Sequence, residues 1–276
     1  MAQTVSETHQ APAYADVVDL NRYPIDQLDS ERGRAFVAEC KKELNATGVC
    51  NLAGFIKPAA VLRMVEIAGE LADKAWPMDR THTIYFETPD ESVADEHPRR
   101  RQVRSAKHGI AYDYLPEDAP VRCLYESDDL TAFIAAVLGK EKLYRSADPL
   151  DGFQVTTFYP GEELGWHFDR SEFSMTVMYQ QADEGGEFVY APGLRNEDDE
   201  NYAGVQQVLD GDESGLKVLP SSPGSLAFFR GEHALHRVTP IEGNTPRVNS
   251  VLTYGERPDM KLNDLTSELF YGRTSA

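Results

Sequence analysis

The feature that most limits the fold of this chain is a series of short segments from about residue 142 onward, rich in β-branched and aromatic residues and separated by turn signals. The segments read F-Q-V-T-T-F-Y, F-S-M-T-V-M-Y-Q, G-E-F-V-Y, S-L-A-F-F-R, A-L-H-R-V and R-V-N-S-V-L-T-Y. Many short strands at close spacing are typical of a β-sandwich or barrel. Two adjacent glycines in E-G-G-E, residues 184–187, indicate a tight hairpin within the series.

The first half of the chain has a different pattern, with apolar residues at helical spacing. Helices are predicted over residues 30–48, 58–75 and 128–138, each with a suitable residue at its start or end. V-C-N-L and T-I-Y-F are strand candidates between them. We therefore expect a mainly β (α+β) protein in which the N-terminal helices pack outside the strands.

The domain organisation follows from these two patterns. We expect residues 1–15 to form a flexible leader and 16–276 a single domain, with helical support over about 16–140 and the strand core over about 141–260. A long acidic insert, 193–215, interrupts the core and contains a short helix candidate. Segments of this length are lids, binding loops or mobile excursions, and the sequence leaves these three possibilities open.

Charge and cysteine content exclude several classes of partner. The net charge of −19 argues against nucleic acid and against an anionic membrane surface, because both require a basic face. Three cysteines without metal-type spacing indicate a reducing compartment. The sequence shows neither an apolar run of membrane-spanning length nor the start of a signal peptide. We expect a cytoplasmic monomer or homodimer that acts on a small molecule.

The stretch G-W-H-F-D-R-S-E-F contains the first candidate site residues. On a strand, His167 and Asp169 point to the same side, which provides two ligands for a metal ion. A third ligand must come from His233 or His236, and we favour His236 because it lies within the better strand. Two imidazoles and one carboxylate leave positions open and suit Fe(II), whereas a closed zinc site needs a fourth protein ligand. An isolated H-x-D also fits a surface ion pair.

Two residues on neighbouring strand candidates extend this site. The guanidinium of Arg247 can form a forked pair with a carboxylate of a metal-bound dicarboxylate. Gln154 can donate to the other carboxylate, although a solvent-facing strand position explains this residue equally well. An exposed edge-strand arginine is the alternative for Arg247, and its flanking valines and leucine argue against that alternative.

Four motifs together resemble the Fe(II)/2-oxoglutarate-dependent oxygenases: G-W-H-F-D-R-S-E-F, G-G-E-F-V-Y-A-P-G-L-R, P-G-S-L-A-F-F-R-G-E-H-A-L-H-R-V-T-P and Y-G-E-R-P. The resemblance is densest over residues 99–275 and is closest to the bacterial free-lysine radical halogenases and their hydroxylase relatives. It implies a double-stranded β-helix (jelly-roll, cupin-like) core. It also implies iron on His167, Asp169 and His236, and 2-oxoglutarate on Arg247.

The resemblance implies the chemistry as well. The halogenases of this branch replace the metal carboxylate with a small residue that makes room for chloride, but this sequence keeps Asp169. The expected reaction is therefore a dioxygenation with Fe(II), 2-oxoglutarate and O₂ that hydroxylates an unactivated C–H bond and releases succinate and CO₂. An oxidative cyclase or desaturase with the same cofactors is the first alternative. A jelly-roll protein that binds metal or ligand without turnover is the second, and a nucleic-acid demethylase disagrees with the charge of −19.

Five residues are candidates for the substrate, and each has an ordinary structural explanation. Arg104 and His108 lie in the basic segment 97–108, which a solvated face also explains, and Arg104 matches by spacing an arginine that holds the substrate carboxylate in the resembled halogenases. The remaining candidates are Arg170 after the metal carboxylate, Asp148 before a proline, and Thr253 on the last core strand. Cationic and anionic groups together predict a small zwitterion, hence a free amino acid.

Overall fold

The computed structural model describes residues 13–276. Its helices are α1 (Tyr14–Val17), α2 (Glu31–Thr47), α3 (Pro58–Glu70), α4 (Pro120–Tyr125), α5 (Asp128–Leu138), α6 (Tyr202–Leu209) and α7 (Asp264–Tyr271), with short 3-10 turns at Ala72–Lys74 and Tyr112–Tyr114. Its strands are β1 (Val49–Leu52), β2 (Trp76–Thr83), β3 (Gln102–Ile110), β4 (Tyr144–Arg145), β5 (Phe153–Phe158), β6 (Leu164–His167), β7 (Ser174–Gln180), β8 (Glu184–Gly185), β9 (Phe188–Ala191), β10 (Lys217–Leu219), β11 (Leu226–Phe229), β12 (Leu235–Val238), β13 (Ile241–Glu242), β14 (Arg247–Leu252) and β15 (Tyr254–Gly255).

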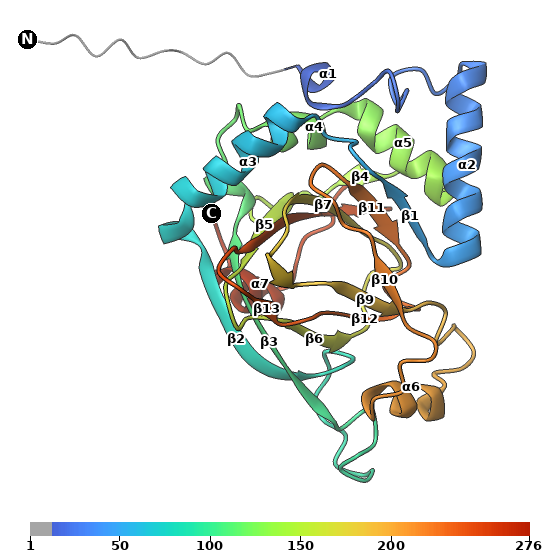
Figure 1. The fold of residues 1–276 in the computed structure, drawn as a ribbon, viewed down its shortest axis with the longest axis vertical. Coiled ribbons are helices and arrows are strands. Elements are labelled where there is room, and N and C mark those ends of the chain that lie inside the picture. Colours follow the sequence, from blue (N-terminus) through green and yellow to red (C-terminus); the bar gives the residue numbers. More distant parts are fainter. Residues whose placement is uncertain (1–12) are drawn as a thin grey trace, which may run out of the picture.

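The main sheet curls around on itself in the order β1-β11-β7-β14-β5-β3-β6-β12-β9-β10, with β2 paired to β3. In Figure 1 the β1-β11-β7-β14-β5 part lies above the β6-β12-β9-β10 part, so the two form opposite walls. Strand β3 joins the walls because it pairs with β5 and, at Ser105, with Leu164 of β6. All these pairings are antiparallel. The predicted jelly-roll fold is therefore confirmed.

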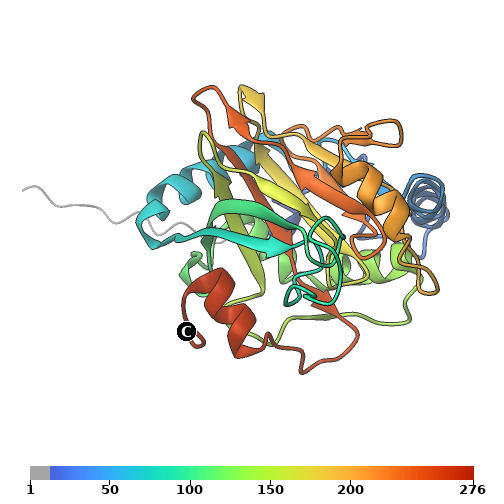
Figure 2. The ribbon, with the colours of Figure 1, turned by 90° about the horizontal axis from the view of Figure 1, so that it is seen from below.

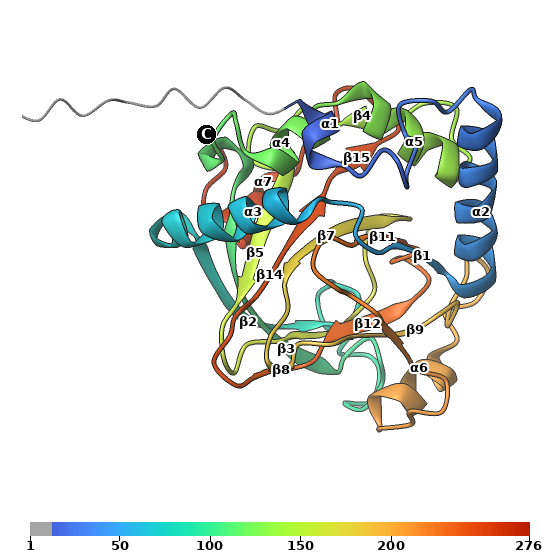
Figure 3. The same ribbon diagram turned by 45° about the horizontal axis from the view of Figure 1, so that its top comes forward.

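The N-terminal helices cover the outer face of the β1-β11-β7-β14-β5 wall (Figures 1 and 3). Three of them occur where the sequence predicts them. The hydroxyl of Ser30 accepts from the amide of Gly33 at the start of α2, and Gly48 ends that helix with a φ of 79° that favours glycine. The largest apolar cluster, which includes the buried Phe133 of α5 and Phe228 of β11, lies between helices and sheet.

The opposite wall is covered by the acidic insert 193–215, which contains α6. Val205 and Leu209 of this helix are buried against Trp166 and Phe168, whose side chains point away from the space between the walls. The insert therefore lies on the outside of the barrel.

Helix α7 packs on β2 and β3 (Figure 2), where the indole nitrogen of Trp76 donates to the carbonyl of Leu269 at 3.2 Å.

Two strand predictions are wrong. Residues 184–187 do not join neighbouring strands, because β7 pairs with β11 and β14 whereas β9 pairs with β10 and β12. The two glycines instead take the chain from one wall to the other, and a Cβ on Gly185 would lie 2.0 Å from the carbonyl oxygen of Pro240. T-I-Y-F contributes only Thr83 to β2. Phe86 turns the chain with a φ of 52°.

The N-terminal part of the chain differs from the expected division in two further respects. The region described as helical support also supplies three strands of the main sheet: β1, which is the predicted strand V-C-N-L, and the longer β2 and β3. Residues 1–12 of the predicted leader lie outside the described residues. The leader's last residues belong to the fold, because α1 begins at Tyr14 and the Tyr14 hydroxyl bonds to Asp129 of α5. Within residues 13–276, no helix combines the length and the apolar character needed to cross a membrane.

Candidate active site

A cavity of about 200 Å³ lies between the two walls of the barrel. Because side chains alternate along a strand, alternate residues of β5, β7, β12 and β14 point into it. Strand β5 contributes Gln154, Thr156 and Phe158, and β14 contributes Arg247, Asn249 and Val251. The other lining residues are Phe86, Lys107, Asp151, Leu164, His167, Asp169, Ser174, Thr176, Phe188, Phe229, His236, Val238, Thr253, Phe270 and Tyr271. The cavity therefore combines aromatic walls with a small number of charged groups.

Three predicted metal ligands meet at one end of this cavity. His167 ends β6, Asp169 follows it, and His236 lies directly opposite His167 in the β12–β6 pairing. The Nε2 atoms of both histidines lie 3.5 Å from Oδ1 of Asp169, and one ligand atom from each residue lies within 4.8 Å of the others. The structure thus selects His236, as predicted, and leaves His233 in the turn before β12.

Hydrogen bonds fix how the two histidines face the site. Nδ1 of His167 donates to the carbonyl of Gly165, and Nδ1 of His236 donates to the carbonyl of Ala234, each at 2.8 Å. A carbonyl only accepts, so each Nδ1 carries the proton of its hydrogen bond, and each Nε2 faces Asp169. Burial and the nearby His236 lower the pKa of His167 to about 4, which keeps this ring neutral near pH 7.

Asp169 is held as a carboxylate in a tight space. Burial opposes its ionisation, but His236 and His167 together hold the pKa of Asp169 well below its usual range. Its Oδ2 accepts from the hydroxyl of Ser174, and its amide donates to the carbonyl of Gly231 at 3.0 Å. A Cβ on residue 231 would lie 1.9 Å from Oδ2, so only glycine fits there. Two neutral imidazoles and a carboxylate on one face are a donor set that fits Fe(II).

A chain of hydrogen bonds supports His167 from behind. Nδ1 of His82 donates to the carbonyl of Thr83 at 2.8 Å, which leaves its Nε2 to accept from the hydroxyl of Ser105 at 2.6 Å. The same hydroxyl oxygen accepts from the amide of Gly165 at 3.0 Å. Because the Gly165 carbonyl accepts from His167, the position of the His167 ring depends on β2 and β3.

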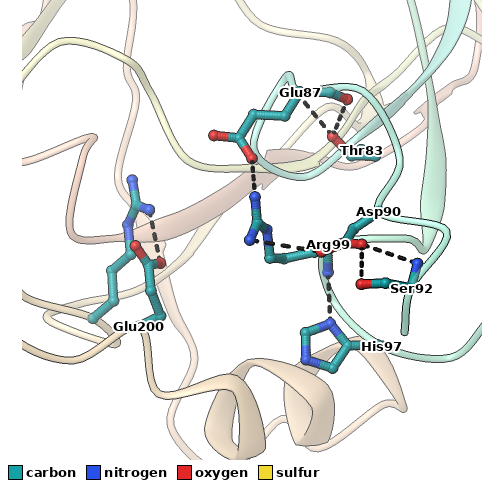
Figure 4. Close-up of polar contacts among 8 residues, drawn as sticks. Thr83, Glu87, Asp90, Ser92, His97, Arg99 and Glu200 are labelled. Carbon is teal, nitrogen blue, oxygen red and sulfur yellow. Dashed lines mark hydrogen bonds and ion pairs between the residues drawn. The ribbon is translucent and has the colours of Figure 1, made fainter. Parts of the chain in front are cut away.

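The loop between β2 and β3 adds an aromatic wall beside the ligands. The ring of Phe86 packs edge-on against His167, with ring centroids 5.3 Å apart. Figure 4 shows how the loop is held: Arg99 forms ion pairs with Glu87 and Asp90 at 3.1 and 3.7 Å, and its amide donates to the ring of His97. This network keeps Phe86 in the cavity wall.

Arg247 is buried without a carboxylate partner among the described residues. Its side chain is 4% exposed, one guanidinium nitrogen donates to Asn249, and its Nε has no partner. Burial lowers the pKa of Arg247 to about 10. A buried charge without a counter-ion is costly, so this guanidinium fits the distal carboxylate of 2-oxoglutarate in the same cavity as the three ligands. Asn249, which orients it, was not found from the sequence.

The comparison with protein families decides the identity. Residues 33–271 match the family described as "HalD: Halogenase D", which is most of the chain. The chain belongs to this family. None of the curated proteins matches it in sequence.

Solved structures with the same fold include several 2-oxoglutarate/Fe(II) oxygenases. An oxidoreductase of the 2OG-Fe(II) oxygenase family from Burkholderia pseudomallei superposes with a TM-score of 0.51, at 15% identity over 81% of this chain and 92% of its own. AviO1 from Streptomyces viridochromogenes Tue57 gives 0.53, at 18% identity over 82% and 97%. The epimerase SnoN, in complex with Fe3+, alpha ketoglutarate and nogalamycin RO, gives 0.52, at 14% identity over 80% and 84%. The family and the fold together place the chain among the 2-oxoglutarate/Fe(II) oxygenases, as the sequence motifs predict.

Gln154 of this Halogenase D family member lines the cavity, as expected, but protein groups already use its amide. Its Nε2 donates to the carbonyl of Phe270 at 3.2 Å, and its Oε1 accepts from the ammonium of Lys107 at 3.2 Å. Lys107 also lies over the ring of Phe270, and burial lowers the pKa of Lys107 to about 8. Gln154 therefore holds Lys107 in the cavity. Lys107 itself was not found from the sequence.

Asp151 is the acidic group at the same end of the cavity. Burial raises its pKa to about 6, against the opposing effect of a hydrogen bond from the Tyr271 hydroxyl at 2.5 Å. Thr253 lines the cavity beside it, at the predicted position. Asp148 does not line the cavity, because its two oxygens accept from the amides of Leu150 and Leu262. It is therefore the turn residue that the alternative interpretation described.

Arg104 and His108 lie on the outer face of β3. Arg104 forms a two-point ion pair with Asp79 at 2.9 Å, and His108 lies 3.1 Å from a carboxylate oxygen of Glu162. Both are an odd number of residues from Lys107, so strand alternation places them on the opposite side from the cavity. Arg170 is exposed and lines an adjoining outer groove. The segment 97–108 thus supplies a cation to the cavity, but from another position than expected.

Proposed function

We propose that this Halogenase D family member is an Fe(II)- and 2-oxoglutarate-dependent dioxygenase that hydroxylates an unactivated C–H bond of a free amino acid, with release of succinate and CO₂. One observation carries the proposal. The cavity that contains the three ligands and the unpaired Arg247 is also lined by a cation, Lys107, and an acid, Asp151. A zwitterion is the class of small molecule that satisfies both.

The chain provides a place for each cofactor. His167, Asp169 and His236 would hold the iron, and Arg247 would hold the distal carboxylate of 2-oxoglutarate. Iron with 2-oxoglutarate and O₂ supplies, when bound, the oxidising power to remove hydrogen from an unactivated C–H bond. The surrounding rings of Phe86, Phe188 and Phe229 and the aliphatic walls keep bulk water away from the reacting carbon.

Hydroxylation is favoured over halogenation by one residue. In the resembled halogenases a small residue replaces the metal carboxylate and makes room for chloride, whereas here Asp169 is present, ionised and fixed by Ser174 and Gly231. Its Oδ1 faces both histidines, so it fills the position that chloride would need. A cyclase or desaturase would use the same residues, and the mass of the product separates it from a hydroxylase.

Lys107 and Asp151 would recognise the two charged groups of the amino acid. The ammonium of Lys107 would bind the substrate carboxylate, and the carboxylate of Asp151 would bind the substrate ammonium, oriented by the Tyr271 hydroxyl. Lys107 is buried and Asp151 is half-buried, so both interactions would be partly shielded from water, where they are stronger. His167, Asp169 and His236 line the same cavity, so a substrate held by these two groups would lie beside the metal.

The visible absorption band of Fe(II) with a bound 2-oxo acid tests the proposal directly. Under anaerobic conditions we expect the band to appear in the wild type, to be absent in His236→Ala, and to shift when the correct free amino acid is added. After O₂ is admitted, the product should gain one oxygen atom. A loss of two hydrogens would identify a desaturase or cyclase, and a chlorine in the product would contradict the role given to Asp169. Iron binding without turnover of any amino acid would favour the non-catalytic alternative.

A further inference from the structure

A second hollow, the outer groove, opens beside the active-site cavity. It has a volume of about 580 Å³ and shares the residues Asp151 and Thr253 with the cavity. The inner cavity, at about 200 Å³, is smaller than the roughly 300–1,000 Å³ of most small-molecule sites, yet it must receive both the cosubstrate and the reacting part of the substrate. The outer groove therefore provides space for a further part of the same substrate.

Only some of the charged residues that line the outer groove form ion pairs. Lys140 forms ion pairs with two glutamates of the groove, Glu172 at 2.8 Å and Glu256 at 2.7 Å. In contrast, Arg170, Arg257 and Lys261 are exposed in the groove and form no ion pair with any residue of the described chain. In a protein with a net charge of −19, three cations without ion-pair partners in one groove would attract an anion.

The position of these cations relative to the metal ligands indicates which part of the substrate they meet. Arg170 directly follows the ligand Asp169, and Lys107 lies in the inner cavity, which Arg170 does not line. The outer groove meets the inner cavity at Asp151 and Thr253, next to the group that would bind the substrate ammonium. A substrate held by Lys107 and Asp151 can therefore place a second charged group in the groove.

We propose that the outer groove recognises a second anionic group, a carboxylate or a phosphoryl group, at the end of the side chain of the amino-acid substrate. The inference rests on the proposed function and specifies its substrate as an acidic amino acid. Arg170, Arg257 and Lys261 bind the terminal anion, with Arg170 and Arg257 able to make forked hydrogen bonds to it. Two anchored ends would also select which carbon of the side chain is oxidised.

Calorimetric titration of the anaerobic protein loaded with Fe(II) and 2-oxoglutarate tests this. The ligands are L-2-amino dicarboxylic acids from aspartate to 2-aminopimelate and O-phospho-L-homoserine, each compared with a neutral amino acid of similar length. We expect at least one anionic ligand to bind ten or more times tighter than its neutral counterpart. The two series separate a carboxylate from a phosphoryl group as the recognised anion.

Three variants test which residues produce the preference for the anionic ligand. The double variant Arg170→Gln, Arg257→Gln should reduce the preference for the anionic member at least fivefold. Arg63→Gln, which removes an arginine from the outer surface of α3, should leave the preference unchanged. Lys107→Met should weaken the anionic and neutral members of a pair alike, because it acts on the amino-acid end.

The outcomes distinguish the inference from the proposed function. Equal binding of the two members of every pair, or a preference that survives the double variant, overturns the groove proposal while amino-acid binding stands. If no amino acid binds, but inorganic phosphate binds the wild type and not the double variant, the groove proposal stands and the free amino acid is wrong. If phosphate fails as well, both are wrong.

Discussion

The two ends of the active-site cavity are built differently. At the metal end, neighbouring protein groups fix His167, Asp169 and His236: both histidines donate to backbone carbonyls, and Asp169 accepts from Ser174. At the other end, the buried Lys107 and the half-buried Asp151 are charged groups whose pKa values lie nearer neutrality, at about 8 and about 6. The first end is arranged before any ligand arrives, whereas the second has charges that a ligand would complete.

The largest expected effect comes from disturbing the fixed end. Gly231→Ala places a Cβ within 1.9 Å of Oδ2 of Asp169, so the carboxylate must move away from its two histidines. Because the ligand geometry is otherwise rigid, we expect the affinity for Fe(II) to fall by about 100-fold, the upper range for changes just outside a metal's ligands.

Gly215→Ala is the matched control, because no atom lies within 4 Å of a Cβ at that position. Fe(II) titration of both variants, with circular dichroism to confirm the fold, measures the difference. Similar Fe(II) affinities for the two variants would mean that the metal end tolerates movement and would weaken the contrast between the two ends.

The substrate end can be tested by comparing the two faces of one strand. Lys107 lies inside the cavity and Arg104 outside it, three residues apart on β3. We expect Lys107→Met to raise the KM for the amino acid by about 10- to 100-fold, the loss of roughly 1.5–3 kcal/mol expected for a charge-assisted hydrogen bond. Arg104→Met should change KM less than about twofold. The opposite ranking would restore Arg104 as the carboxylate-binding residue.

The pH dependence of kcat/KM follows from Asp151 and Lys107. Asp151 binds an ammonium only when ionised, so activity should rise with pH through about 6. Lys107 binds a carboxylate only when protonated, so activity should fall as pH rises through about 8. Each limb should change about tenfold per pH unit outside this window. Lys107→Met should remove the alkaline limb and keep the acid limb, and an unchanged profile would contradict this assignment.

The smallest expected effect tests how far the rigidity of the metal end extends. Ser105→Ala removes the hydroxyl that connects His82 to the backbone of Gly165, one step behind the hydrogen bond to His167. We expect a two- to fivefold loss of Fe(II) affinity, less than the about 10- to 100-fold typical of a direct partner of a ligand. Ser174→Ala, which removes the partner of Asp169, should show the larger loss. Titration with Fe(II) ranks the two, and equal losses would remove the distinction.

The sequence predicts the metal end well because its signal is local. His167 ends β6 and Asp169 follows two residues later, and His236 follows a glycine turn in a recognisable motif. The substrate end was only partly predictable. Lys107 and Asp151 come together because β3 and the turn before β5 meet across the sheet, and spacing along the chain does not show this. The alternation that separates Lys107 from Arg104 becomes visible only once the limits and orientation of β3 are known.

The outer parts of the fold show the same limit. Helices with capping residues, such as α2 and α5, are predictable because their ends are determined by adjacent residues. The role of residues 184–187 was not, because a glycine pair fits both a hairpin and a passage between walls, and long-range strand pairing decides between them. The sequence also does not predict that α7 lines the cavity, because this too depends on contacts between segments that are far apart along the chain.

The unpaired charge of Arg247 has a consequence for the lifetime of the protein. A guanidinium that is buried without a counter-ion makes the ligand-free fold less stable, and any anion that satisfies it shifts the folding equilibrium towards the native state. An anion at one hundred times its dissociation constant would add about 2.7 kcal/mol to the free energy of unfolding. Resistance to heat and to proteases would then rise with the concentration of 2-oxoglutarate, which would make the lifetime of the protein depend on the supply of this metabolite.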